Sequence, residues 1–481
     1  MKQKQYITTT LPYVNAKPHV GFAMEIIRAD ALARYKKLTA HEVFLNTGTD
    51  EHGMKIWENA QAEGIDVQNY VDRYAEDFKG LISLLGLSTD IHFVRTTDEQ
   101  HILAAQEFWK RCNDNGYIYK KNYQAKYCVG CELTKTDSEL IHEECEFHPG
   151  KRLELINEEN YFFNFSATQD FLEKFYKDNP TFVVPDFRFN EIKKFVERGL
   201  QDFSISRLKT KMPWGIPVPG DEDHVMYVWF DALVNYVSTL GWPDNNENFS
   251  DFWENGLPIQ YAGKDNLRQQ SAMWQSMLFA AGLPNSKQVI INGFINSGGQ
   301  KMSKSLGNVI SPYDIVEEYG TDALRYYLLR HVHSFEDSDM TMEKFKEAYN
   351  ANLANGIGNL VQRSMKMIET YNVDISGINF DNHDPILSFH SKHIDEFDYN
   401  KIMNEIWRLI GDLDAFIALN KPFKKIKEDV VGAHKDLKYV AEELNRIAIS
   451  LYPFMPETAA KIQQCLTTSS VPSEPLFIRK D

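Results

Sequence analysis

The sequence lacks several features that would place it in a special class of protein. No apolar run among its 481 residues approaches the roughly 18 that a membrane-spanning helix needs. The first residues, MKQKQYITTTLPY, contain no apolar segment of the kind found in signal peptides. There is no internal repeat and no long low-complexity tract, which argues against a disordered chain. These absences predict a folded cytoplasmic protein with two to four domains.

Cysteine and positive charge are also scarce. An odd number of cysteines, five, in a long chain without a secretion signal argues against a disulfide scaffold. The formal net charge of -16 excludes a surface that is basic all over, but it leaves room for nucleic-acid binding through a local patch. One candidate patch is NKPFKKIK (420–427), which carries four lysines. The alternative is an ordinary solvated helix face.

Strand and helix patterns alternate along much of the chain. QYITTTLP (5–12) has the composition of a β-strand, and the apolar residues of 24–38 recur at the spacing of a helix. Further strands that end in polar loops are predicted in EVFLNTGTDEHG (42–53), PIQYAGKD (258–265) and KQVIINGFI (287–295). This alternation predicts a parallel sheet of the Rossmann type, with ligands bound at the carboxyl ends of its strands.

The alternation is interrupted once and later stops. Residues 118–225 contain three of the cysteines and many aromatics, so we expect an insertion there. Strand signals nearly vanish after residue 346, where the pattern predicts an all-α helical bundle. The expected parts are a Rossmann-type domain in two halves (1–117 and 226–300), the insertion (118–225), a mobile loop with a linking region (301–345) and an α-helical domain (346–481).

The segment CVGCELTKTDSELIHEECEFHPG (128–150) has the spacing of a zinc site. Two pairs separated by two residues each supply four protein ligands, which leaves no open position on a tetrahedral ion. We therefore predict one structural Zn²⁺, a zinc knuckle, with the ligands Cys128, Cys131, Cys145 and His148. His142 is an alternative fourth ligand, and unrelated buried thiols are the alternative to a metal site. Cys112 and Cys465 have no such partners.

Two glycine-containing loops could bind phosphate. In LPYVNAKPHVGF (11–22), His19 precedes Gly21 at a predicted helix start, where unpaired N–H groups attract anions. Taken alone, this loop is more readily explained as a helix-capping turn. In GGQKMSKSLGN (298–308), two lysines stand between glycines, which suits a loop that moves. The family resemblance described next implies that these lysines act on phosphate.

Together, PHVGF (18–22) and KMSKS (301–305) resemble the two signatures of the class I aminoacyl-tRNA synthetases. Within that family the whole chain resembles the methionyl-tRNA synthetases. The resemblance extends to GTDEHG, the zinc motif, GLQDFSISR, WGIPVPG and YVWFDALVNY. The predicted insertion is too short for the editing domain of relatives that charge leucine, isoleucine or valine. In the cysteine enzyme, by contrast, zinc belongs to the catalytic centre.

The resemblance implies a reaction and a set of site residues. Methionine would be activated by Mg-ATP to methionyl-adenylate and transferred to the 3′-terminal adenosine of tRNA(Met). Methionine is expected to contact Leu11, Tyr13, Asp50, Val228, Trp229, Ala232, Tyr236 and Gln270. ATP binding and catalysis are expected of Lys17, His19, Gly21, Phe22, Lys301, Ser303 and Lys304. The anticodon is expected to contact Asn352, Pro422 and Phe423.

Three positions depart from the family pattern. Gln270 stands where a histidine usually lines the methionine pocket, Asn266 where an aliphatic residue is usual, and Phe423 where a tryptophan stacks on an anticodon base. The chain also ends without the extra C-terminal module of some relatives, so we expect a monomer. Two alternatives stay open: a synthetase retuned to another amino acid, and a non-catalytic tRNA-binding paralogue. The intact His19, Asp50 and Lys304 argue against the second.

Overall fold

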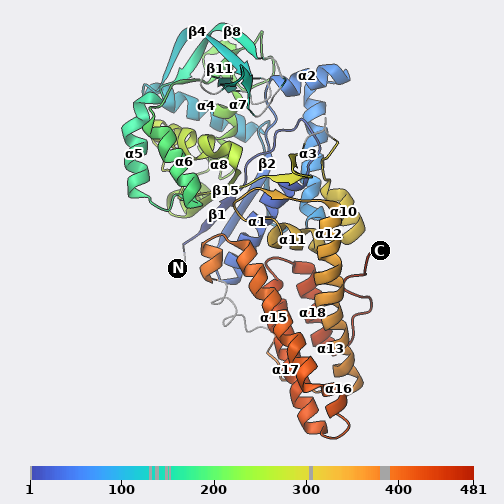
Figure 1. Cartoon of the computed structure of the whole chain (residues 1–481). Coiled ribbons are helices and arrows are strands. Elements are labelled where there is room, and N and C mark those ends of the chain that lie inside the picture. The colour runs from blue at the N-terminus through green and yellow to red at the C-terminus, as the bar shows by residue number, and fades with distance from the viewer. Residues whose placement is uncertain are drawn as a thin grey trace.

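The chain folds into an α/β part and a long helical part, joined end to end (Figure 1). The α/β part fills the upper half of the view, and the helices that follow residue 359 extend below it. The structure is a computed structural model, and it describes residues 3–128, 133–135, 140–146, 150, 153–302, 307–379 and 391–481.

One parallel sheet organises the α/β part. Its strands are β1 (Gln5–Thr8), β2 (Val43–Thr49), β3 (His92–Arg95), β9 (Val183–Val184), β14 (Leu257–Gly263) and β15 (Gln288–Asn292). Among the described residues they lie in the order β3-β2-β1-β14-β15-β9, and every neighbouring pair is parallel. The four strands predicted in this part of the sequence and the parallel α/β sheet are confirmed.

Helices cover both faces of this sheet. They are α1 (Val20–Leu38), α2 (Met54–Glu63), α3 (Val67–Leu84), α4 (Glu99–Asp114), α7 (Val228–Ala232), α8 (Asn235–Ser238) and α9 (Trp274–Ala280), with the short turns η3 (Phe249–Glu254), η4 (Lys264–Asn266) and η5 (Gln269–Met273). Because successive strand residues point to opposite faces, Ile7 and Leu45 join the core on the α1 side, whereas Tyr6 and Phe44 pack on the side of α4 and α9.

The range predicted as an insertion has an antiparallel sheet of its own. It contains β4 (Ile118–Cys128), β5 (Leu133–Lys135), β8 (Glu154–Phe163) and β10 (Phe203–Ser204), in the order β10-β8-β4-β5. Smaller elements are β6 (Leu140–Ile141), β7 (Glu144–Cys145), η2 (Ser166–Thr168), α5 (Gln169–Asp178), α6 (Asp186–Glu197), β11 (Ser206–Leu208), β12 (Pro217–Val218) and β13 (Asp221–Met226). Within the same range, β9 returns to the edge of the main sheet beside β15.

A small β-structure and three helices link the two parts of the molecule. The strands β16 (Ile295–Ser297), β17 (Gln300–Lys301) and β18 (Ser338–Asp339) form a sheet in which β16 lies between the other two. The helices are α10 (Pro312–Tyr319), α11 (Thr321–Arg330) and α12 (Met342–Ala348). The β16–β17 hairpin contains the first part of the predicted lysine loop, up to Lys301, whereas residues 303–306 of that loop lie outside the described residues.

The elements that the described residues form from 349 onward are all helices, as predicted. They form η7 (Tyr349–Gly358), α13 (Asn359–Thr370), α15 (Tyr399–Asn420), α16 (Pro422–Lys425), α17 (Val430–Leu451) and α18 (Pro456–Thr468). Along α15, buried apolar residues recur every three or four positions, at Ile402, Ile406, Leu409, Leu413 and Ile417. In the described part of the chain, no helix combines the length and apolarity needed to cross a bilayer.

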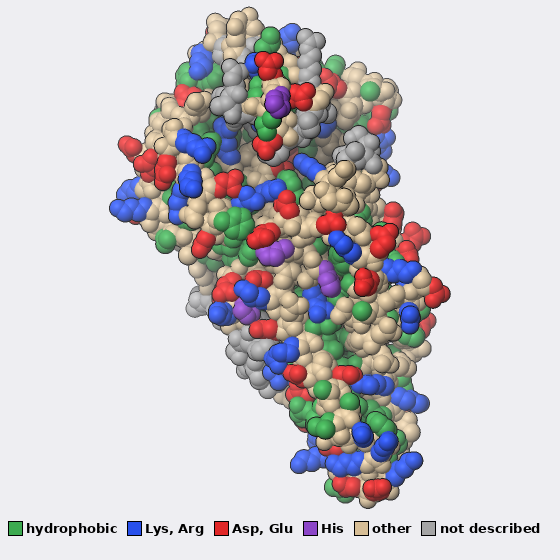
Figure 2. Space-filling view, viewed as in Figure 1, with side chains coloured by type: hydrophobic (Ala, Val, Ile, Leu, Met, Phe, Trp, Pro, Cys, Tyr) green, Lys and Arg blue, Asp and Glu red, His purple; other side chains and the backbone are tan. Residues whose placement is uncertain are grey.

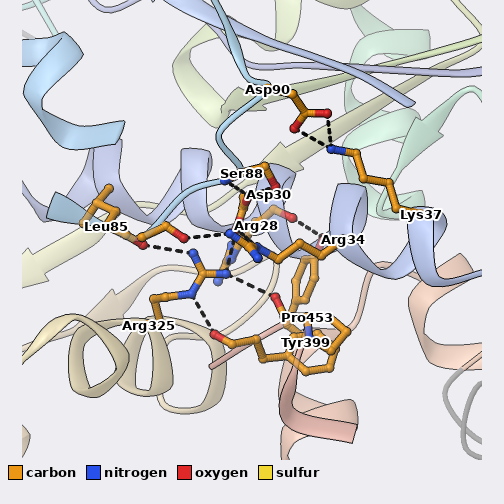
Figure 3. A network of polar contacts seen from close by, with 12 residues as sticks. Arg28, Asp30, Arg34, Lys37, Leu85, Ser88, Asp90, Arg325, Tyr399 and Pro453 are labelled. Atoms are coloured by element: carbon orange, nitrogen blue, oxygen red, sulfur yellow. Dashed lines mark hydrogen bonds and ion pairs between the residues drawn. The ribbon is translucent and has the colours of Figure 1, made fainter. Parts of the chain in front are cut away.

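A buried ion pair fastens the two parts to each other (Figure 3). The guanidinium of Arg325, on α11, donates from Nη2 to Oδ2 of Asp30, on α1, over 2.8 Å, and both side chains are fully buried. The remaining Arg325 bonds go to the carbonyls of Leu85, Pro453 and Phe454. The guanidinium therefore ties the first helix of the sheet to the chain between α17 and α18.

Candidate active site

A cavity of about 330 Å³ opens at the carboxyl ends of the central strands, where the sequence predicted a ligand site. Its walls come from the loops after β1 and β2, from α7 and α8, and from the turns η4 and η5 that follow β14. The cavity is lined by all eight residues predicted to contact methionine: Leu11, Tyr13, Asp50, Val228, Trp229, Ala232, Tyr236 and Gln270. Parallel pairing of β1 with both β2 and β14 brings these distant segments to one edge.

Asp50 stands in the cavity wall on a backbone that is paired with the neighbouring loop. Its N–H donates to the carbonyl of Pro12 at 3.0 Å, and its own carbonyl accepts from the N–H of Val14 at 3.1 Å. The side chain is 7% exposed. A carboxylate held in this way can form an ion pair with the ammonium group of an amino acid.

The two residues after Asp50 anchor its loop in opposite directions. Glu51 is fully buried and accepts two bonds from Arg95, at 2.7 and 2.8 Å. His52 Nδ1 lies 3.0 Å from Oδ2 of Asp231, a buried residue of α7. The loop is therefore joined both to the end of β3 and to α7, the helix that supplies the cavity residues Val228, Trp229 and Ala232.

Tyr236 and Gln270 meet on the wall of the cavity. The Gln270 amide donates from Nε2 to the Tyr236 hydroxyl at 2.7 Å, and both residues are at most 2% exposed. Burial raises the pKa of Tyr236 well above its usual range. The hydroxyl thus keeps its proton at neutral pH and can act as a hydrogen-bond donor.

His19 caps the N-terminus of α1, as the sequence predicted. Its Nδ1 accepts from the N–H of Gly21 at 3.0 Å, which leaves the proton of the neutral ring on Nε2. A Cβ added at Gly21 would lie 2.7 Å from Cε1 of His19, so the folded-back ring requires glycine there. Burial and then the charge of Lys301 lower the pKa of His19 to about 4. The neutral imidazole is a donor suited to a phosphate oxygen.

Lys301 is on β17, at the start of the predicted lysine loop, and it lines the cavity together with Phe22. Its ammonium lies 4.9 Å from the centre of the Phe294 ring. Burial raises the pKa of Asp265, and the charge of Lys301 opposes that rise. Ser303 and Lys304, also predicted to bind ATP, lie outside the described residues.

Some polar groups of the cavity were not predicted as site residues. Asp265 and Lys135 line it, the latter from β5 of the inserted sheet. Glu25, on α1, accepts bonds from the N–H and hydroxyl of Thr10, another lining residue, at 2.7 and 2.6 Å. Asp265 directly follows a predicted strand, which is a usable signal. Lys135 gives none, because only the fold brings its strand to the cavity.

Comparison with known proteins decides the family. The model for tRNA synthetases class I (M) matches residues 5–151 and 136–365 of the chain. Two curated relatives are each 39% identical: a methionine–tRNA ligase of Thermotoga maritima, over 98% of this chain and 76% of the relative, and one of Brucella suis, over 97% and 92%. The chain belongs to the class I tRNA synthetases.

A solved synthetase has the same fold throughout. The methionyl-tRNA synthetase of Mycobacterium tuberculosis in complex with methionyl-adenylate superposes with a TM-score of 0.90 at 33% identity, covering 99% of this chain and 98% of that one. The apo form of the same synthetase gives a TM-score of 0.83 at 30% identity, covering 100% and 99%. The α/β sheet and the helical part are therefore both features of this family of synthetases.

Half of the predicted zinc ligands of this synthetase fall within the described residues. Cys128 ends β4 and Cys145 ends β7, and both thiols are buried. Cys131 and His148 lie outside the described residues. In the ranges that the structure describes, no three His, Cys, Asp or Glu side chains gather as a metal site. Two buried soft donors at strand ends fit the chemistry of zinc.

The far end of the helical part carries exposed lysines and apolar side chains. Here Phe423, on α16, is 42% exposed, whereas Pro422 is buried. Figure 2 shows blue and green side chains together at the lower end of the molecule. We call this surface the helical tip; its residues are Leu419, Lys421, Phe423, Lys424, Lys427, Val430 and Val431.

Asn352, the third residue predicted to contact the anticodon, is not at the helical tip. Its Oδ1 accepts from Arg330, whose guanidinium also donates to Asn404 near the start of α15. At a rise of 1.5 Å per residue, the rest of α15 separates that level from Phe423 by about 25 Å. The structure thus places Asn352 near the junction with the α/β part, apart from Phe423.

Proposed function

We propose that the cavity activates L-methionine with ATP, and that the enzyme then transfers the methionyl group to the 3′-terminal adenosine of tRNA(Met). The enzyme is a ligase, like the methionine–tRNA ligases with which it shares 39% identity over nearly its whole length. The observation that carries the assignment of the site is that all eight predicted methionine contacts line one cavity, beside Phe22 and Lys301.

In the amino-acid end of the cavity, Asp50 would hold the substrate ammonium. Tyr13 and Trp229 supply aromatic walls, which suit a polarizable thioether. The protonated hydroxyl of Tyr236 is a donor for the sulfur, and Gln270 lies beside it. Together these groups would orient the carboxylate of methionine toward ATP.

At the ATP end, the reaction needs stabilisation of charge and no covalent enzyme nucleophile. A carboxylate oxygen of methionine attacks the α-phosphorus, and the bond to pyrophosphate breaks. His19, through Nε2–H, and Lys301 would meet the charge that develops on the phosphates, because Lys301 lines the cavity and the His19 ring packs on Phe22, another lining residue. We assign Lys17, Ser303 and Lys304 to the same task from the resemblance of their motifs.

In the second step a hydroxyl of the terminal ribose attacks the methionyl carbonyl, and AMP leaves. The tRNA would reach the helical tip with its anticodon, where Phe423 can stack on a base and the lysines can face phosphates. We further propose that the predicted ranges 1–117 and 226–300 serve catalysis, with 346–481 serving tRNA recognition. The enzyme is expected to act as a monomer in the cytoplasm, where tRNA and ATP are found.

A test of the reaction is ATP–pyrophosphate exchange measured with each amino acid in turn. Methionine should support the highest kcat/KM. Preference for another amino acid would point to a retuned synthetase, and exchange with none would point to a tRNA-binding paralogue without catalysis. Charging of tRNA(Met) with labelled methionine completes the test.

We also propose one structural Zn²⁺ on Cys128, Cys131, Cys145 and His148. Bound zinc would cross-link the short strands of this region. Metal analysis should find one zinc per chain in the wild type and a large loss in Cys145→Ser. Cys112→Ser removes a buried thiol outside the motif and should leave the zinc content unchanged. Full zinc in Cys145→Ser would contradict the assignment.

A further inference from the structure

A line of buried amides and hydroxyls runs from Tyr236 away from the cavity. The Gln270 amide, which donates to Tyr236, accepts at Oε1 from Nε2 of Gln260, on β14, at 3.2 Å. Gln260 Oε1 in turn accepts from the hydroxyl of Ser286. Ser286 Oγ accepts from Nε2 of Gln275, on α9, at 3.1 Å. We call these five residues the relay; each is at most 2% exposed.

The relay has a fixed direction because its far end meets a backbone donor. Gln275 Oε1 accepts from the N–H of Ser286 at 3.2 Å and from the amide of Asn285 at 3.1 Å. A backbone N–H can only donate, so a reversed Gln275 amide would set two buried donors against each other. Its other N–H donates to the carbonyl of Gln270 at 2.9 Å, which holds the same orientation.

The orientation of Gln275 fixes the orientations of the other residues of the relay in turn. Since Ser286 Oγ accepts from Gln275, its single proton goes to Gln260 Oε1. That fixes the Gln260 amide with its nitrogen toward Gln270, and the Gln270 amide with its nitrogen toward Tyr236. The Tyr236 oxygen is then an acceptor within the relay. The hydroxyl proton then points away from Gln270, on the side where Tyr236 lines the cavity together with Asn235.

We propose that Gln260, Gln275 and Ser286 are positioning residues that direct the Tyr236 hydroxyl proton into the cavity, where it meets the sulfur of methionine. The proposal rests on the proposed function and goes further, because it assigns side-chain selectivity to residues that do not line the cavity. A thioether sulfur is a weak acceptor, whereas the methylene group in its place in norleucine accepts nothing. A proton aimed at this point therefore favours methionine over norleucine.

The test compares kcat/KM for methionine and for norleucine by ATP–pyrophosphate exchange. Ser286→Ala removes the donor that holds Gln260, so both amides can reverse and Tyr236 can donate to Gln270 instead. The methionine-to-norleucine ratio should fall about 2- to 10-fold, the range of one neutral hydrogen bond. Gln260→Met breaks the relay at another member and should lower the ratio by a similar factor.

Three further variants separate this role from a general structural one. The double variant Ser286→Ala/Gln260→Met should lose no more selectivity than the larger single loss, because both changes interrupt one line. Ser286→Thr keeps a hydroxyl and should keep the ratio. Ser276→Ala is the matched control, since it removes a buried serine hydroxyl, 2.8 Å from that of Thr168, outside the relay.

Two outcomes would overturn the proposal, and they are distinguishable. If the wild type prefers methionine and the methionine-to-norleucine ratio is unchanged in both Ser286→Ala and Gln260→Met, the relay does not direct the proton. Equal losses of kcat/KM for methionine and for norleucine also leave this ratio unchanged and lead to the same conclusion. If the wild type prefers another amino acid, the proposed function itself fails, and the relay assignment fails with it.

Discussion

The cavity and the helical tip are built in opposite ways. Around the cavity, polar side chains such as Tyr236 and Gln270 are buried and already hydrogen-bonded to each other. At the tip, Leu419 and Val431 are more than 80% exposed, and lysines stand beside them. A small substrate can be enclosed by groups fixed in advance, whereas a large polyanion must be met by a surface that is open before it binds. The four variants below test this contrast.

The largest effect on stability is expected at the buried junction between the α/β part and the helical part. Arg325→Met removes the buried guanidinium that pairs with Asp30 and leaves that carboxylate with Arg34 as its remaining ion-pair partner. The backbone carbonyls that accept from Arg325 also lose their donor. Loss of one partner of a buried pair typically costs about 3–5 kcal/mol of stability, which urea unfolding would measure. The control is Lys37→Met, because Lys37 pairs with Asp90 at the surface and such pairs contribute about 0–1 kcal/mol. Equal losses in the two variants would contradict this account.

Next in size is the loss of the carboxylate that faces the amino acid. Asp50→Asn removes the proposed partner of the ammonium group, and truncating one member of a buried charge pair costs about 2–5 kcal/mol. We expect kcat/KM for methionine in pyrophosphate exchange to fall by a factor of about 30 or more. Binding of tRNA at the helical tip should not change. A variant with near-normal exchange would remove Asp50 from the site.

The buried carboxyl of Glu25 should make stability depend on pH. Burial raises its pKa from the ordinary 4.5 to about 7, against the opposing hydrogen bonds from Thr10. The folded protein therefore holds this proton more tightly than the unfolded chain does. The resulting stability is complete below about pH 4.5 and is lost as the pH rises through 7.

Unfolding of the wild type and of Glu25→Gln across this range gives the measurement. The difference in unfolding free energy between them should change by on the order of 3 kcal/mol between pH 4.5 and pH 7.5, with the wild type losing stability. Glu428→Gln, near the exposed helical tip, is the control and should track the wild type. If the difference in unfolding free energy does not vary with pH, folding does not raise the pKa of Glu25.

The smallest effect is expected at the helical tip. Phe423→Ala should weaken charging of tRNA by about 1–3 kcal/mol, the usual contribution of a base stacked on an aromatic ring. Pyrophosphate exchange should stay near the wild-type rate, because the cavity lies in the other part of the molecule. Phe187→Ala, on α6, is matched in exposure at 45% and should change neither reaction. If Phe423→Ala slows tRNA charging and pyrophosphate exchange equally, the Phe423 ring contributes to packing of the helical part and does not contact tRNA.

The sequence predicted what local patterns and short motifs encode. Four of the six strands of the main sheet, the helical end of the chain and the eight cavity residues follow from composition, periodicity or family motifs, whereas β3 and β9 were not predicted. The pairing of β9 with β15 was not predictable, because two residues carry no periodic signal. The relay was equally hidden: Gln260 and Ser286 are ordinary polar residues until parallel pairing of β14 and β15 brings them together.

Asn352 shows a different limit. A motif match assigned it to the anticodon, but motif matching carries no information about where along a helical bundle a residue stands. The bonds from Arg330 place it near the junction. Only the three-dimensional arrangement shows that Asn352, on η7, and Phe423, on α16, lie at different levels of the helical part.

The buried junction has a consequence for how a tRNA is selected. The Tyr399 hydroxyl bonds to Tyr261 of β14 and to the backbone of Arg28, so the start of α15 is fixed on the sheet. With 22 residues, α15 extends about 33 Å from that point to the tip. Under the proposed function, a tRNA places its acceptor end at the cavity and its anticodon at the helical tip, two points whose separation the protein fixes. The distance between the cavity and the helical tip would therefore be a criterion of selection. A nucleic acid whose acceptor end and anticodon are too close together or too far apart would be rejected without any contact to its bases.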